Sequence, residues 1–171
     1  MGSYDDATRL GRATGAVPDT ALVRHNASRP GIALNLEQEI NADVGAFARV
    51  SFNDGSKEAH DFTDVNKSLS GGYVVKVNRW MRADDRFGLG AAVNDLSHAA
   101  RSYFAAGGLG ILIGDGQRPR YGREYIVEAF YSMTVIKHLA VRTDYQYVIN
   151  PAYSRDRGPV SIFGVRAHAE F

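Results

Sequence analysis

Residues 139–149 read Leu-Ala-Val-Arg-Thr-Asp-Tyr-Gln-Tyr-Val-Ile. Every second residue, beginning with the leucine, is apolar or aromatic apart from one threonine. The residues between them include Arg142, Asp144 and Gln146. Successive side chains of a β-strand point to opposite faces of the sheet, so this alternation predicts a strand with one apolar and one polar face.

The same alternation extends through most of the chain on both sides of this segment. Further alternating segments occupy residues 32–36, 44–52, 69–77, 87–93, 125–135 and 163–171. Together they predict an all-β fold of about seven strands, most of them longer than the ~5–6 residues usual in a soluble sheet. The chain has no run of about 18 apolar residues, which excludes a transmembrane helix.

Composition agrees with a β fold and excludes several functions. The chain has 171 residues, with 18 glycines, 9 tyrosines and 8 phenylalanines, a mixture that favours strands and turns. Its 20 basic and 19 acidic residues give a net charge of +1, so no nucleic-acid partner is expected. Cysteine is absent, which excludes disulfides, thiolate metal sites and a cysteine nucleophile.

The connections between the predicted strands alternate in length. Short turns at 41–43, 81–85 and 136–138 alternate with longer polar or glycine-rich loops at 54–67, 97–121 and 150–158. Short periplasmic turns and long outer loops are typical of an antiparallel up-and-down β-barrel of the outer membrane. This order of short turns and long loops makes the last strand run from the outer side to the periplasmic side, and it predicts that Phe171 lies at the periplasmic face.

The longest loop contains a helix signal. Ser97 is a suitable N-cap for a short helix over residues 98–106, and Gly107-Gly108 would end it. Ala99, Ala100, Tyr103 and Phe104 share one side of this predicted helix. Two interpretations remain open: the loop folds over or into a barrel mouth, or the helix covers one end of a sheet.

Aromatic residues on the apolar face gather near the predicted strand ends. The expected girdle consists of Phe52, Tyr125, Tyr147 and Phe163 near the outer ends, and Phe87 and Trp80 near the inner ends. Between the two groups the apolar face is mainly Ala, Val, Leu and Ile. Aromatic girdles on either side of an aliphatic band are what two membrane interfaces select.

The opposite face carries charges and amides at strand centres, where burial in a dry core would be costly. The predicted pore-lining residues and candidate sugar contacts are Asn35, Glu37, Arg49, Lys76, Glu128, Arg142, Asp144 and Arg166. Carboxylates accept hydrogen bonds from sugar hydroxyls and guanidinium groups donate to them, so this mixture suits neutral polyhydroxylated solutes. The alternative is that these are ordinary solvated residues in cross-strand ion pairs.

Catalytic and cofactor signals are weak. The five histidines are dispersed without metal-ligand spacing. Glu124 and Glu128 are separated by about 13 Å along one strand face, too far to act on one bond. The glycines of residues 108–116 do not have the spacing of a dinucleotide-binding loop. We therefore expect no enzymatic activity, no metal and no cofactor.

Four stretches carry a family resemblance. They are Asn-Leu-Glu-Gln-Glu at 35–39, Phe-Thr-Asp-Val at 62–65, Ala-Ala-Gly-Gly-Leu-Gly at 105–110, and Asp-Tyr-Gln-Tyr-Val-Ile-Asn-Pro at 144–151 followed by Arg-Asp-Arg-Gly at 155–158. From about Thr20 to its C-terminus the chain resembles the carbohydrate-selective porin (OprB) family of Gram-negative outer membranes.

The resemblance implies a sugar-permeable diffusion channel in the outer membrane of a Gram-negative bacterium. It also implies contact with outer-membrane lipid and small carbohydrates, homotrimers, and a terminal Phe171 that the barrel-assembly machinery recognises. The family's barrels are longer than this chain and begin with a signal sequence. We therefore interpret residues 1–171 as the C-terminal segment of a porin barrel, with a loop-like N-terminus (1–29) and strands over 30–171.

Seven strands would leave this barrel incomplete, because bacterial single-chain barrels have even strand numbers. We expect that the chain by itself forms no stable channel. Two alternatives to a working channel segment remain. One is a soluble small β-barrel that binds a small ligand inside an apolar interior, and the other is a non-functional truncated porin.

Overall fold

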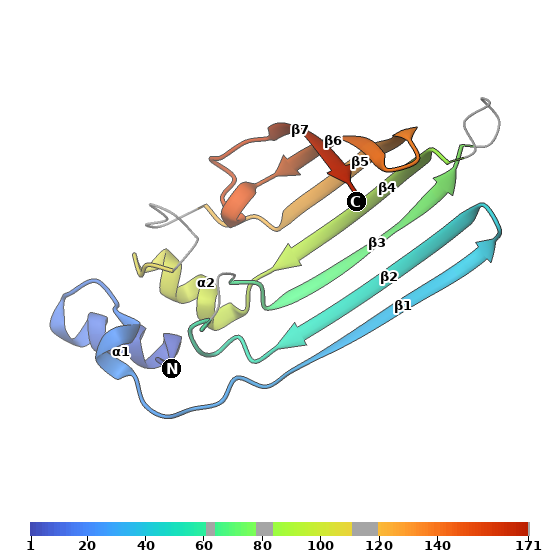
Figure 1. Ribbon diagram of the computed structural model, residues 1–171. Helices are drawn as coiled ribbons and strands as arrows, with labels where there is room; N and C mark the ends of the chain where they lie inside the picture. The colour runs from blue at the N-terminus through green and yellow to red at the C-terminus, as the bar shows by residue number, and fades with distance from the viewer. Residues whose placement is uncertain (61–63, 78–83, 111–119, 171) are drawn as a thin grey trace.

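The computed structural model describes residues 1–60, 64–77, 84–110 and 120–170 (Figure 1). Its seven strands form a single sheet in the order β1-β2-β3-β4-β5-β6-β7. The strands are β1 (Gly31–Asn41), β2 (Val44–Asn53), β3 (Lys67–Lys76), β4 (Arg86–Asp95), β5 (Glu124–Ile136), β6 (Leu139–Ile149) and β7 (Val160–Ala169). All six neighbouring pairs are antiparallel, which confirms the predicted up-and-down order.

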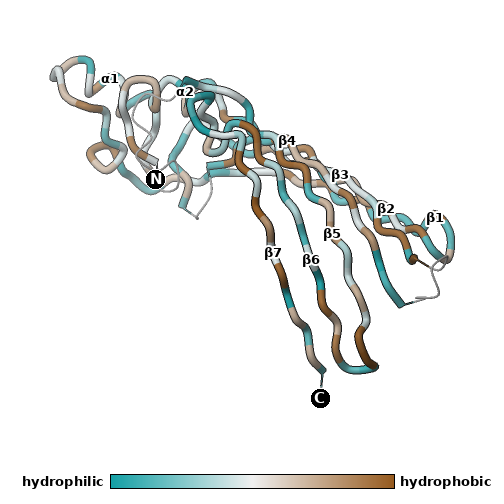
Figure 2. The backbone as a smooth tube through the Cα atoms, turned by 90° about the horizontal axis from the view of Figure 1, so that it is seen from above, coloured by the Kyte–Doolittle hydropathy of each residue, from teal (hydrophilic) through white to brown (hydrophobic). Residues whose placement is uncertain are grey.

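The sheet is open. In the described part of the chain β1 pairs only with β2 and β7 only with β6, so each has one edge without a strand partner. Figure 2 shows the strands as one curved layer that extends away from the helices. The result is an arc of barrel wall rather than a closed barrel.

Strand β1 is longer than the alternation of residues 32–36 predicts. It continues to Asn41 because Glu37 pairs opposite Phe47 and Glu39 opposite Gly45, which keeps its polar end in the ladder. A register shift between Glu39 and Asn41 then leads into the short turn before β2. Cross-strand pairing, rather than the local apolar pattern, sets the end of this strand.

The N-terminal segment differs from the prediction. A loop-like structure is expected for residues 1–29, but the structure has helix α1 (Tyr4–Thr14) and the 3₁₀ turn η1 (Thr20–Val23). The Ser3 side chain caps α1 by accepting a hydrogen bond from the Asp6 amide, and Gly15 ends it in a left-handed conformation. Tyr4, Ala7, Thr8 and Gly11 recur at helical spacing and are buried, which supplies the packing that a short helix needs.

The second helix is the predicted one. Helix α2 (His98–Ala105) begins where the Ser97 hydroxyl accepts a hydrogen bond from the Ala100 amide at 3.0 Å. It lies beyond the end of β4 and beside α1 (Figure 1), in agreement with the interpretation that it covers a sheet end. No helix in the described residues is long and apolar enough to cross a membrane.

The main buried cluster lies at this helical end of the molecule. We call it the end cluster: Tyr4, Ala7, Leu96, Ala100, Tyr103, Phe104 and Tyr153. The rings of Tyr4 and Tyr103 are 4.9 Å apart, and Tyr103 meets Phe104 edge-on at 5.3 Å. The Tyr4–Tyr103 pair joins α1 to α2. Tyr153 belongs to the same cluster and lies in the β6–β7 connection, which contains the 3₁₀ turn η3 (Pro151–Tyr153). The sheet, by contrast, has few buried side chains on either face.

Candidate functional site

Strand register brings the predicted pore-lining residues to one face of the sheet. Directly opposite residues in an antiparallel pair point to the same side. Arg49 lies opposite Asn35 on β1 and opposite Ser70 on β3, and Arg142 lies opposite Arg166 on β7. Even steps along each strand and the remaining pairings place all eight candidates together. We call this side of the sheet the polar face.

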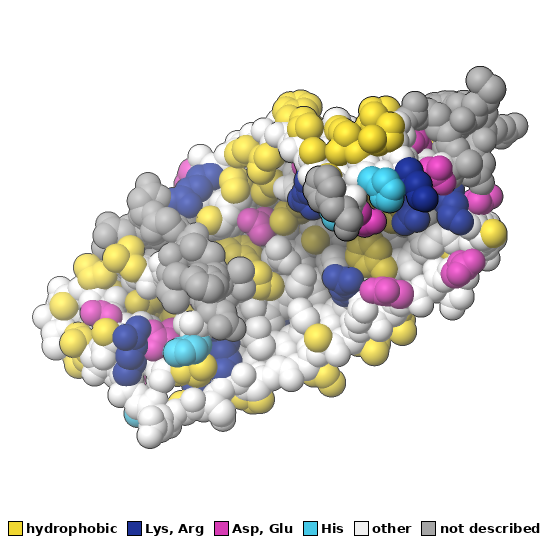
Figure 3. All heavy atoms as spheres, in the orientation of Figure 1, with side chains coloured by type: hydrophobic (Ala, Val, Ile, Leu, Met, Phe, Trp, Pro, Cys, Tyr) yellow, Lys and Arg dark blue, Asp and Glu magenta, His cyan; other side chains and the backbone are white. Residues whose placement is uncertain are grey.

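The polar face is hollowed and carries side chains of both charges (Figure 3). Two hollows open on it, with volumes of about 570 and 290 Å³. The larger hollow lies over the β1–β2 hairpin and the adjacent ends of β3 and β4, and the smaller one lies over the middle of β2–β5. A concave face with convergent polar groups is where a small solute would be held.

One charged cluster joins β1 and β2. Arg49 donates from Nε to the Asn35 side-chain oxygen at 2.7 Å and from its terminal nitrogen to Glu37 at 3.3 Å. Asn35 in turn donates to the same Glu37 oxygen at 3.1 Å. The Arg49 guanidinium also stands 5.3 Å from the centre of the Phe47 ring. More than half of the Arg49 and Glu37 side-chain surface stays exposed, so both can reach a solute.

A second cluster, between β5 and β6, is more tightly arranged. Glu128 accepts hydrogen bonds from Arg142 at 2.8 Å and from Gln146 at 3.0 Å, one on each carboxylate oxygen. The Arg142 guanidinium lies 3.6 Å from the centre of the Phe130 ring, which is stacking distance. The arrangement fixes a flat, charged surface next to a carboxylate with solvent access on the hollowed face.

Phe47 and Phe130 are functional candidates that sequence reasoning missed. Both occupy positions on the polar face, where the alternation predicts polar side chains. Glycines make room for the two rings: a Cβ at Gly72 would lie 2.8 Å from a Phe47 ring carbon, and one at Gly88 would overlap the Phe130 ring. The available signal was an aromatic residue two positions from an arginine or glutamate on the same strand face.

The remaining three candidates lie apart from these clusters. Lys76 donates to the Ala42 carbonyl at 2.7 Å, which directs its ammonium group toward the β1–β2 turn. Asp144 lies opposite Gly164, where the missing side chain leaves space for its carboxylate. Arg166 lies opposite Arg142 and is exposed.

The predicted girdle residues lie on the opposite face of the sheet. Phe52 is paired with Ile32, Phe87 with Val75, Tyr125 with Val93 and Ile149, Tyr147 with Val127, and Phe163 with Tyr145. This face is apolar and uncovered: Ile32, Phe163 and Val165 are 74%, 80% and 79% exposed. Trp80 and Phe171 lie outside the described residues.

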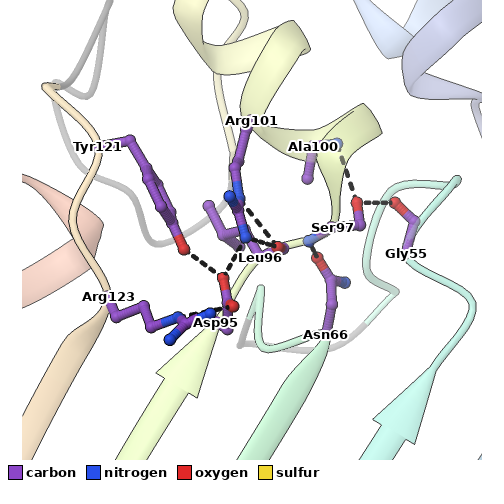
Figure 4. Close-up of polar contacts among 9 residues, drawn as sticks. All are labelled: Gly55, Asn66, Asp95, Leu96, Ser97, Ala100, Arg101, Tyr121 and Arg123. Atoms are coloured by element: carbon purple, nitrogen blue, oxygen red, sulfur yellow. Dashed lines mark hydrogen bonds and ion pairs between the residues drawn. The ribbon is translucent and has the colours of Figure 1, made fainter.

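A polar network holds the helical end onto the strands (Figure 4). Asp95 at the end of β4 accepts from Arg101 of α2 at 2.6 Å, from Arg123 at 3.0 Å and from the Tyr121 hydroxyl. Burial and the neighbouring carboxylate raise the pKa of Tyr121 to about 12. Ser97 donates to the Gly55 carbonyl, so the β2–β3 loop is tied to the same joint.

A second network fixes the N-terminal segment. Glu58 accepts two hydrogen bonds from Arg24, at 2.7 and 2.9 Å, and one each from the Thr20 hydroxyl and the Gly2 amide. The hydrogen bonds from Arg24 lower the pKa of Glu58 to about 2. Sequence patterns gave no indication of this clamp, because it joins residues more than 30 positions apart.

The described residues contain no group of three or more His, Asp or Glu that could hold a metal ion. The two polar clusters consist of arginines, carboxylates and amides at ordinary hydrogen-bond distances. Their geometry suits reversible contacts with a hydroxylated or charged solute.

One antiparallel sheet in sequential order, with an exposed apolar face and a hollowed polar face, defines a wall segment of a transmembrane β-barrel. The family model of the carbohydrate-selective porins, OprB family, matches residues 2–171. The chain belongs to this family, which is a class of outer-membrane channels and not of enzymes.

A solved structure supports the fold. The chain is similar to Pseudomonas putida OprB in its high-pH structure, with a TM-score of 0.69 and 19% sequence identity. The likeness covers 82% of this chain but 35% of the other one, so the described sheet corresponds to about a third of that protein. No curated protein sequence matches the chain.

Proposed function

We propose that this chain forms part of the wall of an outer-membrane channel for passive, carbohydrate-selective diffusion of small sugars. The observation that carries the proposal is the stacked cluster of Phe130, Arg142 and Glu128 on the hollowed polar face. A pyranose has apolar C–H faces that pack on an aromatic ring and hydroxyls that bond to guanidinium and carboxylate groups. Phe47, Arg49 and Glu37 repeat this combination on the other side of the face.

In this proposal the polar face lines the water-filled pore. The eight predicted pore-lining residues would contact the passing solute, and their mutual pairs would keep them in fixed positions. The apolar face would contact outer-membrane lipid, with Phe52, Phe87, Tyr125, Tyr147 and Phe163 at its interfaces. The chain would then act in the outer membrane of a Gram-negative bacterium.

Two further partners belong to the same proposal. The barrel-assembly machinery would recognise the aromatic C-terminus at Phe171. Three copies of the complete channel would associate into a homotrimer. Deletion of Phe171 should reduce the amount of protein in the outer membrane without changing its synthesis, measured by fractionation and immunoblotting.

A soluble ligand-binding barrel needs the apolar face inside. Here the hollowed face carries the charges, and Ile32, Phe163 and Val165 on the other face are largely exposed. Exposing such a face to water is unfavourable, whereas lipid covers it without cost. The channel therefore accounts for both faces, and the soluble barrel accounts for neither.

Liposome swelling tests the proposal on the channel purified from outer membranes in detergent. The unmodified protein should admit glucose faster than a disaccharide. Phe130→Leu should slow glucose entry several-fold, because the flat ring beneath Arg142 is lost while an apolar side chain remains. Phe52→Leu, the same change on the opposite face, serves as the matched control.

The outcomes are distinct. Equal glucose entry through Phe130→Leu and unmodified channels would remove the stacked cluster from the sugar path. No glucose entry through a channel that is correctly folded would instead support the non-functional truncated porin.

A further inference from the structure

The apolar face of the sheet carries charge at one end only. In the seven described strands, Lys67 of β3 and Asp95 of β4 are the charged residues of this face. Lys67 lies opposite Phe52 on one side and opposite Asp95 on the other, so both charges share the face of the predicted girdle. A cation on a lipid-facing strand is costly at the bilayer centre and tolerated at its interfaces. The position at the strand ends therefore places these charges at the level of the lipid headgroups.

Two arginines join them at the same end of the sheet. Asp95 accepts from Arg101 of α2 at 2.6 Å and from Arg123, which directly precedes β5, at 3.0 Å (Figure 4). We call Lys67, Arg101 and Arg123 the outer cations. Asp95 is the one carboxylate among three cations, so the group keeps two positive charges.

The outer cations have unused hydrogen-bond donors. Lys67 is exposed, and in the described part of the chain no carboxylate lies within ion-pair distance of it. The Arg123 side chain is 58% exposed and bonds to Asp95 through Nε, while its terminal nitrogens have no acceptor among the described residues. Ammonium and guanidinium groups in this state form strong bonds to a phosphate.

An uncovered apolar surface begins next to these cations. Leu69 is two residues from Lys67 on the same face of β3, and Tyr125 is two residues from Arg123 on β5. Two residues along a strand span about 7 Å. Phe52, Leu69 and Tyr125 are 50%, 56% and 42% exposed. The surface thus offers cations and then apolar side chains, which is the order of groups in an anionic lipid.

The other end of the apolar face lacks this feature. There the described strands end in apolar residues that pair with one another, such as Val44 with Val75 and Leu139 with Ala169. The cations therefore mark one leaflet of the membrane. In the proposed channel the long loops are on the outer side, so that leaflet is the outer one.

We propose that the outer cations, together with Phe52 and Leu69, form a binding site for a phosphorylated lipid of the outer leaflet, the lipid A part of lipopolysaccharide. Lys67 and Arg123 are two strands, or about 10 Å, apart. Lipid A carries a phosphate at each end of a disaccharide, so one headgroup can meet both cations while its acyl chains cover the apolar face. This inference rests on the proposed channel for its orientation, but it concerns a lipid partner and not the solute.

Native mass spectrometry tests the site on the channel purified from outer membranes, after detergent exchange has removed bound lipid. Titration compares lipid A, the same lipid without its phosphates, and phosphatidylethanolamine. Lipid A should bind about tenfold or more tightly than the other two, because its phosphates form charge-assisted hydrogen bonds with the cations. Its affinity should decrease as salt rises from about 0.05 to 0.5 M. Inorganic phosphate at equal ionic strength should not displace it, because the free ion lacks acyl chains.

Lys67→Gln should weaken the binding of lipid A several-fold, and Lys67→Gln/Arg123→Gln should reduce it to the affinity of the phosphate-free lipid. The matched control is Lys137→Gln, the same change in the exposed turn between β5 and β6, which should leave the affinity unchanged. Heat-modifiable electrophoretic mobility checks that each variant is folded. Because Arg123 also bonds to Asp95, the single variant and the phosphate-free lipid give an answer even where the double variant does not fold.

Equal affinity for lipid A with and without phosphates, or an equal loss in Lys137→Gln, would overturn the proposal. Displacement by inorganic phosphate would overturn the lipid as occupant and assign the cations to a free anion. Phosphatidylethanolamine that binds as tightly as lipid A would overturn the choice of lipid. Failure of glucose entry in the swelling assay affects the proposed channel only, because lipid binding is measured without transport.

Discussion

Glycine at position 88 makes the stacked cluster of the polar face possible. Its Cα lies against the Phe130 ring, and any Cβ there would overlap ring carbons. The ring in turn supports the Arg142 guanidinium at 3.6 Å. A residue without a side chain on one strand therefore positions a cation two strands away.

Gly88→Ala should destabilise the sheet by about 1–3 kcal/mol, since Phe130 must leave its position to admit the methyl group. Gly45→Ala is the matched control on the same face, because its Cβ would meet nothing closer than the Gln38 carbonyl at 4.0 Å. The urea midpoint in detergent measures both changes. Equal midpoints for the two variants would contradict this account.

Glu58 gives the N-terminal clamp a defined pH dependence. Its pKa is lowered from 4.5 to about 2, chiefly by hydrogen bonds from Arg24. A carboxylate with a lowered folded-state pKa stabilises the fold above its unfolded value and loses that contribution as pH falls. Protection of the α1 amides from hydrogen exchange should therefore decrease from about pH 4.5 down to pH 2.

Glu58→Gln should reduce that protection already at pH 6 and flatten its decrease in acid. Asp54 also has a pKa lowered to about 2, by Lys57 and Ser56, and remains in the variant. The quantity to compare is therefore the difference in α1 protection between the unmodified protein and Glu58→Gln at each pH. If α1 protection decreased in parallel with falling pH in both proteins, Glu58 would be excluded as the titrating group.

At the scale of elements, α2 depends on one serine. The Ser97 hydroxyl accepts from the Ala100 amide and donates to the Gly55 carbonyl. Ser97→Ala should cost about 1 kcal/mol for the cap and weaken the tie to the β2–β3 loop. Ser102→Ala, inside the helix, should be neutral or slightly stabilising. Hydrogen exchange of the α2 amides distinguishes the two, and equal protection in both variants would show that the cap is dispensable.

The strands could be predicted from sequence because apolar and polar side chains alternate along them with period two. That alternation alone assigns Tyr145 to the apolar face and Arg142 to the polar face, without knowledge of the neighbouring strand. Helix α2 was predictable from Ser97 and the two glycines. Helix α1 was missed although Ser3, Tyr4 and Ala7 carry its cap and buried stripe, since its packing partner α2 lies some 90 positions away. The alternation also gave no indication that Phe130, an apolar residue, lies on the polar face.

The contacts between neighbouring strands could not be predicted, because the sequence of one strand does not fix its register with the next. Arg86 and Arg166 lie in the same row of the polar face only because β5 and β6 between them are paired in one particular register. A shift of one residue in either pairing would move a cation to the other face. The two clusters of the polar face therefore follow from the assembled sheet, whereas their charged members, but not Phe47 and Phe130, follow from the alternation.

At the scale of the whole molecule, the directions of the two end strands decide whether the chain can form a closed barrel by itself. Six antiparallel pairings make β1 and β7 run the same way. They cannot complete an antiparallel barrel with each other, nor with those of a second copy in the same orientation. An open edge in lipid leaves strand N–H and C=O groups without partners, which is costly for each group.

The 171-residue chain by itself should therefore form no stable channel in a planar bilayer, whereas the channel purified from outer membranes should conduct. Addition of a segment whose end strands run antiparallel to β1 and β7 should restore conductance, because it satisfies both edges. Conductance is recorded at equal protein amounts, with detergent alone as the control. Steady unit conductance from the isolated chain would show that its edges find partners in another way, and the directional argument would be wrong.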